Sequence, residues 1–163
     1  MKRMAPVGFI GLVLFSCVFM GLAYAQPSIQ TGGGSWELHC VFKIGFDAVR
    51  GKPTSAAKIW AKVLWSAMPM NAITLEIPSI DFTRLPRSNK LEIRGAFIFV
   101  MGDSMTCDGD FILAFMLLRP VNLGSGVFYY SDRMHVGYFG GNLDFIGDEA
   151  YRVMGLLFVY MKQ

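Results

Sequence analysis

Two short motifs in this sequence contain the residue types of a serine hydrolase. Gly102-Asp103-Ser104 follows an apolar stretch, and Asp132-Arg133-Met134-His135 lies downstream. A serine nucleophile needs a histidine base that is held by a carboxylate, and Gly-Asp-Ser hydrolases have comparable blocks. Those enzymes use a parallel α/β sheet with the serine near its start, and here no helical pattern separates the two motifs. We therefore interpret both motifs as turns and predict no catalytic residue.

The sulfur and imidazole groups could support redox or metal chemistry. Cys40 and Cys107 are either a disulfide, which an oxidising compartment permits, or two buried thiols. The two histidines, His39 and His135, are scattered and show no metal-ligand spacing with the cysteines. The sequence therefore predicts no metal site and no cofactor.

The N-terminus has the pattern of an export signal. Lys2 and Arg3 precede an apolar run from 7 to 22, and Ala23-Tyr24-Ala25 then forms a small-x-small cleavage pattern before Gln26. The apolar run is short for a membrane span of about 20 residues. We predict a signal peptide over 1–25, a flexible lead-in over 26–35 and a single domain over 36–163. The predicted location is the periplasm or the exterior.

Composition limits the class of partner. The chain has 163 residues, of which 53% are hydrophobic and 17% charged, so it is not a disordered chain. Its net charge is only +3, and two of the basic residues lie in the predicted leader. No basic run is present to bind nucleic acid or to hold anionic lipid. We expect no nucleic-acid partner and only transient membrane contact.

Alternating apolar residues predict that most of the domain is β-strand. The alternation is clearest over 36–46 and recurs over 73–77, 91–101, 111–118, 127–130, 134–139 and 150–161. Proline residues and the runs Gly124-Ser125-Gly126 and Gly140-Gly141-Asn142 are expected to lie between strands, and Asp108 and Asp110 around Gly109 are expected to form a turn. The prediction is all-β: an antiparallel barrel of about eight strands.

One segment, 54–68, fits either a helix or a strand. As a helix it would resemble the central helix of hot-dog thioesterases, an α+β fold, with Asp47 in the position of a catalytic acid. A predicted export signal argues against that alternative, because acyl-CoA is cytosolic. A strand over 54–68 would favour the barrel.

Aromatic and aliphatic side chains dominate one face of the predicted strands. They would pack a core or line an apolar cavity. The opposite face of 111–118 is apolar too, which indicates a cover such as a helix, a second subunit of a homodimer or lipid. The predicted ligand-lining residues are Trp36, Leu38, Phe42, Ile44, Phe46, Leu75, Ile77, Ile93, Phe97, Phe99, Phe111, Leu113 and Phe115.

Several short stretches, spread in order through the predicted domain, form a set of strand and turn motifs. They are Trp36-Glu37-Leu38, 44–51, Lys58-Ile59, Val63, 73–81, Arg87 with Leu91, Leu143-Asp144-Phe145-Ile146-Gly147, and 147–149 with Val153. Together these stretches resemble the YceI-like family of exported, lipocalin-shaped polyisoprenoid-binding proteins. Departures include His39-Cys40 without the family's serine and Ser88 in place of an aspartate after Arg87.

This resemblance implies a lipocalin-like barrel that sequesters a long apolar lipid and is not an enzyme. A few polar groups at the mouth, such as Arg94 or His39, would then fix the lipid head. A thioesterase-like enzyme is the second alternative. A small outer-membrane barrel is the third, although charged residues such as Glu37, Lys43 and Glu92 stand in the middle of predicted strands.

Overall fold

The computed structural model describes residues 34–55, 58–70, 73–85, 88–101, 105–118 and 120–163. Residues 35–163 form one compact unit. The predicted leader and most of the lead-in lie outside the described residues. The strands are β1 (Trp36–Val49), β2 (Ile59–Ser66), β3 (Ile73–Arg84), β4 (Lys90–Met101), β5 (Met105–Met116), β6 (Asn122–Tyr130), β7 (His135–Gly147) and β8 (Ala150–Lys162).

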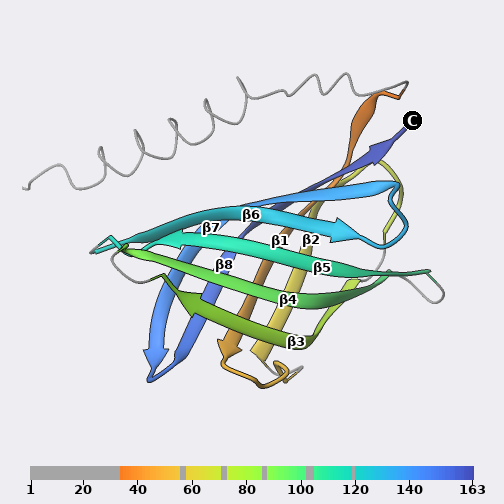
Figure 1. Cartoon of the computed structure of the whole chain (residues 1–163). Helices are drawn as coiled ribbons and strands as arrows, with labels where there is room; N and C mark the ends of the chain where they lie inside the picture. Colours follow the sequence, from red (N-terminus) through yellow and green to blue (C-terminus); the bar gives the residue numbers. More distant parts are fainter. Residues whose placement is uncertain (1–33, 56–57, 71–72, 86–87, 102–104, 119) are drawn as a thin grey trace, which may run out of the picture. The chain divides into compact units, whose positions relative to one another are not determined.

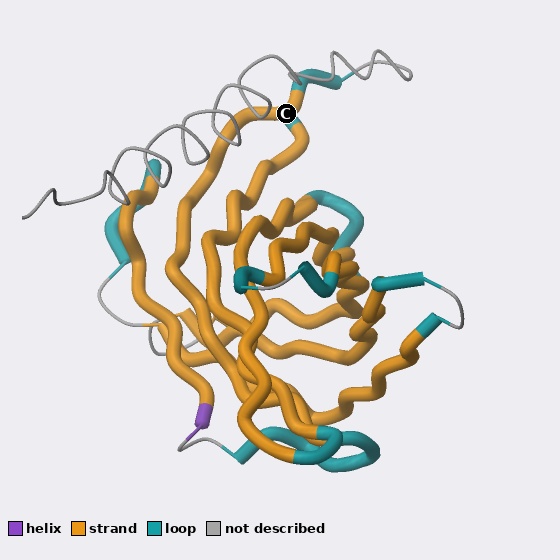
Figure 2. Tube along the Cα trace, turned by 90° about the vertical axis from the view of Figure 1, so that its left-hand side faces the viewer, coloured by secondary structure: helices purple, strands orange, loops and turns teal. Residues whose placement is uncertain are grey.

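The eight strands form one antiparallel sheet in the order β2-β1-β8-β7-β6-β5-β4-β3. Apart from β2 and β3, consecutive strands pair as hairpins, and the first strand closes on the last through a ladder that runs from Trp36–Lys162 to Val49–Ala150. The sheet curls around an interior (Figures 1 and 2), so that β1 faces β4 and β5 across it. The predicted all-β, lipocalin-like barrel architecture is confirmed.

The edge strands β2 and β3 meet where the sheet curls back on itself. They contact each other, yet within the described residues their contact includes no ladder. A single bridge lies nearby and joins Thr54, which precedes β2, to Ile77 of β3. In this bridge the Thr54 N–H donates to the Ile77 carbonyl at 3.1 Å. We call this line between β2 and β3 the seam. It is the place where the wall of the barrel has the fewest backbone hydrogen bonds.

The ambiguous segment 54–68 contains a strand. Residues 59–66 form β2, which pairs with β1 from Phe46–Ile59 to Cys40–Ser66. The α+β hot-dog alternative, which required a central helix here, is therefore wrong. Within the described residues, no helix is long and apolar enough to cross a membrane.

Three glycine-containing runs that were expected to lie between strands lie inside them. Gly109 is in the middle of β5, the run 124–126 is within β6, and the run 140–142 is within β7. Glycine occurs inside these strands because of close packing, not because of an unusual backbone conformation. A Cβ at Gly109 would overlap the backbone carbonyl of Tyr129, so the two strands approach more closely than another residue would allow.

Candidate ligand-binding interior

The inward faces of the strands form a continuous apolar interior. Eleven of the predicted ligand-lining residues are buried there, each at most 3% exposed. These are Phe42, Ile44, Phe46, Leu75, Ile77, Ile93, Phe97, Phe99, Phe111, Leu113 and Phe115. Sequence reasoning missed Ala48, Ile80, Phe82, Leu91, Phe128, Tyr130, Phe139, Leu143, Val153, Leu157 and Val159, which are also buried.

The other two predicted ligand-lining residues, Trp36 and Leu38, lie outside the interior, and each is 37% exposed. The register of β1 against β8 shifts between Leu38 and Cys40, as at a β-bulge. Cys40 pairs with the inward Val159, whereas Leu38 pairs with Tyr160 on the outer face. The irregularity reverses the alternation, so the prediction for these two residues was wrong.

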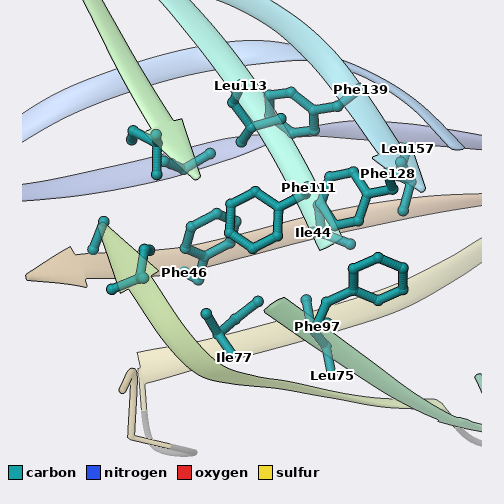
Figure 3. Close-up of a cluster of buried hydrophobic side chains, with 14 of the residues drawn as sticks. Ile44, Phe46, Leu75, Ile77, Phe97, Phe111, Leu113, Phe128, Phe139 and Leu157 are labelled. Atoms are coloured by element: carbon teal, nitrogen blue, oxygen red, sulfur yellow. The ribbon is translucent and has the colours of Figure 1, made fainter. Parts of the chain in front are cut away.

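Aromatic rings from opposite walls meet inside the barrel. Phe42 of β1 stacks on Phe99 of β4 with ring centroids 5.5 Å apart, and Phe46 of β1 contacts Phe111 of β5 at 5.6 Å. Figure 3 shows Phe46, Phe111 and their neighbours pointing toward one another from several strands. The centre of the interior is therefore a packed aromatic core at these two levels.

Inward-facing glycines make room for other aromatic rings of the interior, those of Phe139 and Phe115. A Cβ at Gly141 or at Gly155 would overlap the ring of Phe139, and one at Gly124 would overlap the ring of Phe115. A small barrel can hold bulky side chains only where neighbouring inward positions are small. The inward-facing glycines of β6, β7 and β8 are thus part of the core.

We expect Gly155→Ala to lower the free energy of unfolding by about 1–3 kcal/mol, because the new methyl group overlaps Phe139 and the Gly140 carbonyl. Denaturant titration measures this change. The matched control is Gly147→Ala, whose Cβ would meet only the Ala150 Cβ at 3.7 Å. The control should change the value by less than about 0.5 kcal/mol. Equal effects of the two substitutions would contradict the role assigned to Gly155.

Along the seam the apolar interior is only partly covered. The inward side chains of β2, Ile59, Ala61 and Val63, pack against the core but remain half-buried. Their counterparts on β1, such as Phe42 and Ile44, are fully buried. The seam is therefore where apolar surface continuous with the interior can be reached from outside.

Polar groups gather at the end of the barrel where β1 begins and β6 ends. The His39 and His135 rings lie 5.6 Å apart, and His135 lies 5.6 Å from the ring of Tyr130. Asp132 Oδ2 pairs with Nδ1 of His135 at 2.7 Å, and Asp132 Oδ1 accepts hydrogen bonds from the N–H groups of Met134 and His135. We call His39, Tyr130, Asp132 and His135 the polar mouth.

The charge states of the polar mouth follow from these contacts. Burial, together with the neighbouring His135, lowers the pKa of His39. Burial alone would raise the pKa of Asp132, but the hydrogen bonds from His135 and the backbone outweigh it and lower that pKa. At neutral pH the mouth therefore contains a carboxylate, and an imidazole at His39 that burial keeps neutral.

The two cysteines lie beside the polar mouth as free thiols. Burial raises the pKa of Cys40 to about 12, and the nearby Cys107 adds to the effect. Burial and the charges of Asp132 and Asp108 also raise the pKa of Cys107. Both groups are therefore neutral thiols at physiological pH, which makes them poor nucleophiles and poor metal ligands.

The remaining candidates from the sequence do not assemble into a reactive site. Arg94 is on the outer face of β4, bonded to Glu92, and so is not at the mouth. Asp47 is buried and receives two hydrogen bonds from Arg152, at 2.8 and 3.1 Å. Ser104 lies outside the described residues. Among the described residues, no group of three or more His, Cys, Asp or Glu side chains could hold a metal ion.

No family model, curated protein or solved structure matches this chain. The geometry of its own residues is therefore the basis for a functional proposal.

Proposed function

We propose that this protein is an exported carrier that sequesters a long apolar lipid of the isoprenoid type. The observation that carries the proposal is the seam, where half-buried apolar side chains of β2 lead into an interior made of apolar residues. The export-signal pattern of the first 25 residues and the resemblance to YceI-like proteins support the same function.

The chemistry of the interior favours a hydrocarbon over a polar ligand. Burying a methylene stabilises a complex by about 0.8 kcal/mol, so a long chain needs no charged partner inside the barrel. The rings that meet at Phe42–Phe99 and Phe46–Phe111 occupy the centre. A chain would therefore lie between β2 and this aromatic core, directly under the seam. His39 in the polar mouth would hydrogen-bond a polar head.

The apolar interior also bears on the outer-membrane alternative. Transmembrane barrels carry apolar side chains outward around a polar interior. Here the inward faces are apolar, and exposed or half-exposed charges such as Glu76, Asp81 and Arg94 are on the outer faces of β3 and β4. This arrangement favours a carrier.

Lipid extraction tests the proposal. Protein recovered after expression of the full chain with export is extracted with organic solvent, and mass spectrometry should detect a prenyl or acyl lipid at close to one molecule per protein. If no lipid is detected and a fluorescent apolar probe does not bind, the proposal is wrong.

A substitution under the seam localises the site. We expect Ala61→Trp to weaken binding of the fluorescent probe at least about tenfold, because Ala61 packs against the core under the seam and an indole there would block the proposed site. The matched control is Lys62→Trp, the next residue along β2, whose side chain is exposed on the outer face. If both substitutions weaken binding equally, the ligand does not lie under the seam.

A further inference from the structure

The outer face of β5, β6, β7 and β8 is an unusual surface, because its central residues carry no charge. The strand registers arrange these residues in rows that cross the four strands. One row contains large side chains, Ile112, Val127, Tyr138 and Phe158. The next row contains Ala114, Ser125, Gly140 and Leu156, and is thus small on β5, β6 and β7.

The two rows form a ridge beside a groove. The groove is open at its centre, since a Cβ placed on Gly140 would have no heavy atom within 4 Å, and Ala114 and Ser125 are exposed. The row beside the ridge contains Asp110, Tyr129, Val136 and Tyr160, of which only Asp110, at the β5 edge, is charged. The row beside the groove contains Met116, Leu123, Asn142 and Met154, all uncharged. Such a surface, rich in Tyr, Phe and Met, has the composition of the centre of a protein interface.

We propose that this face binds a second copy of the same chain as a twofold-symmetric dimer. An isologous interface must be complementary to itself. A twofold axis that lies in the interface, parallel to the rows and between them, sets each ridge over the partner's groove. Tyr138 then packs onto Gly140 of the partner subunit, Val127 onto Ser125 of the partner subunit and Ile112 onto Ala114 of the partner subunit.

The size of the face is consistent with this partner. Four strands about 4.8 Å apart, with roughly eight uncharged residues each, cover on the order of 500 Å² in projection. Side-chain relief increases the accessible area toward the roughly 800 Å² per partner of a standard interface.

The charges at its border disfavour a membrane surface as the partner. Acidic residues outnumber basic ones at the described strand ends and turns, which would repel anionic lipid. The acidic residues are Asp108, Asp110, Asp132, Asp144, Asp148 and Glu149, and the basic ones are Arg133, Arg152 and Lys162.

The test is the mass of the protein in solution. In sedimentation velocity across a concentration series, the protein recovered after expression of the full chain should have the mass of two copies. Gly140→Arg should raise the dissociation constant of the dimer at least about 100-fold, because it places a charged side chain in the groove. Since the space around Gly140 is open, its circular dichroism spectrum and probe binding should not change.

The matched control is Thr74→Arg, which adds the same charge on the exposed outer face of β3 and should leave the dimer intact. A monomeric wild-type protein at about 100 µM, or a dimer that Gly140→Arg does not weaken, would overturn the proposal. So would a monomer that co-sediments with phosphatidylcholine vesicles and loses that binding in Gly140→Arg, since the face would then bind a bilayer.

Discussion

Replacement of Phe97 by alanine is expected to lower the free energy of unfolding by about 3–5 kcal/mol. Phe97 is fully buried, and its ring lies 5.0 Å from the rings of Phe128 and Tyr130 and 5.5 Å from that of Phe99. Its removal leaves a cavity that these neighbours, held on β4 and β6, cannot fill. Denaturant titration of the wild type and the variant provides the measurement.

The control for Phe97→Ala is Ile98→Ala, which removes the next side chain on the outer, half-buried face of β4. This control substitution should lower the free energy of unfolding by about 1 kcal/mol. A loss of less than 1 kcal/mol for Phe97→Ala would mean that the rings do not support one another. The interior would then be a loose cavity rather than a packed core, and a lipid could occupy its centre.

Alkylation of Cys40 in the folded protein is expected to be about 1000-fold slower than in the denatured chain at pH 8.5. Only the thiolate reacts, and burial raises the pKa of Cys40 to about 12, some three units above that of an ordinary cysteine. Mass spectrometry after timed iodoacetamide labelling measures the rate in a Cys107→Ser variant. The reciprocal Cys40→Ser variant reports on Cys107, which is less buried and should react faster. In the wild-type protein, thiols at Cys40 and Cys107 that react only after reduction would instead show a disulfide between them.

The burial of Cys40 and Tyr130 also makes the free energy of unfolding fall at alkaline pH. Burial, with nearby Cys40 and Cys107, raises the pKa of Tyr130 well above its ordinary value, as burial does for Cys40. The folded state keeps both protons to a higher pH than the unfolded chain does. For Cys40 the stabilisation is therefore complete below about pH 8.5 and is lost as the pH rises toward 12. For Tyr130 the loss begins only above about pH 10, the ordinary pKa of a tyrosine. Each group lowers the free energy of unfolding by up to about 1.4 kcal/mol per pH unit within its range.

The architecture could be predicted from sequence because alternation is visible wherever both faces carry side chains. β1 and β4 are examples, since Phe42, Ile44, Phe97 and Phe99 alternate with smaller or polar residues. The pattern was lost where inward positions are glycine. In β6 and β7 the glycines have no side chain to mark a face, so a strand interior looked like a turn.

Other features depend on contacts that no local pattern reveals. The irregularity near His39 that turns Trp36 and Leu38 outward exists only in the register with β8. β2 was ambiguous because it carries tryptophan on its outer face: the Trp60 ring lies where a Cβ of Gly45 would be. The polar mouth could not be found either, because it combines His39 of β1 with residues from the end of β6 to the start of β7, which are far from His39 in sequence. Only the spacing of Asp132 and His135 hinted at it.

The pairing of β1 with β8 determines when this chain can finish folding. Hairpins from β3 to β8 join neighbours in sequence and can form as each is synthesised. β1 has only β2 beside it until residues 150–162 are available, and an isolated hairpin is marginally stable in water. The first strand is thus the last to be secured. If the chain is exported unfolded, as the proposed function requires, this order keeps the barrel open until β8 has been made.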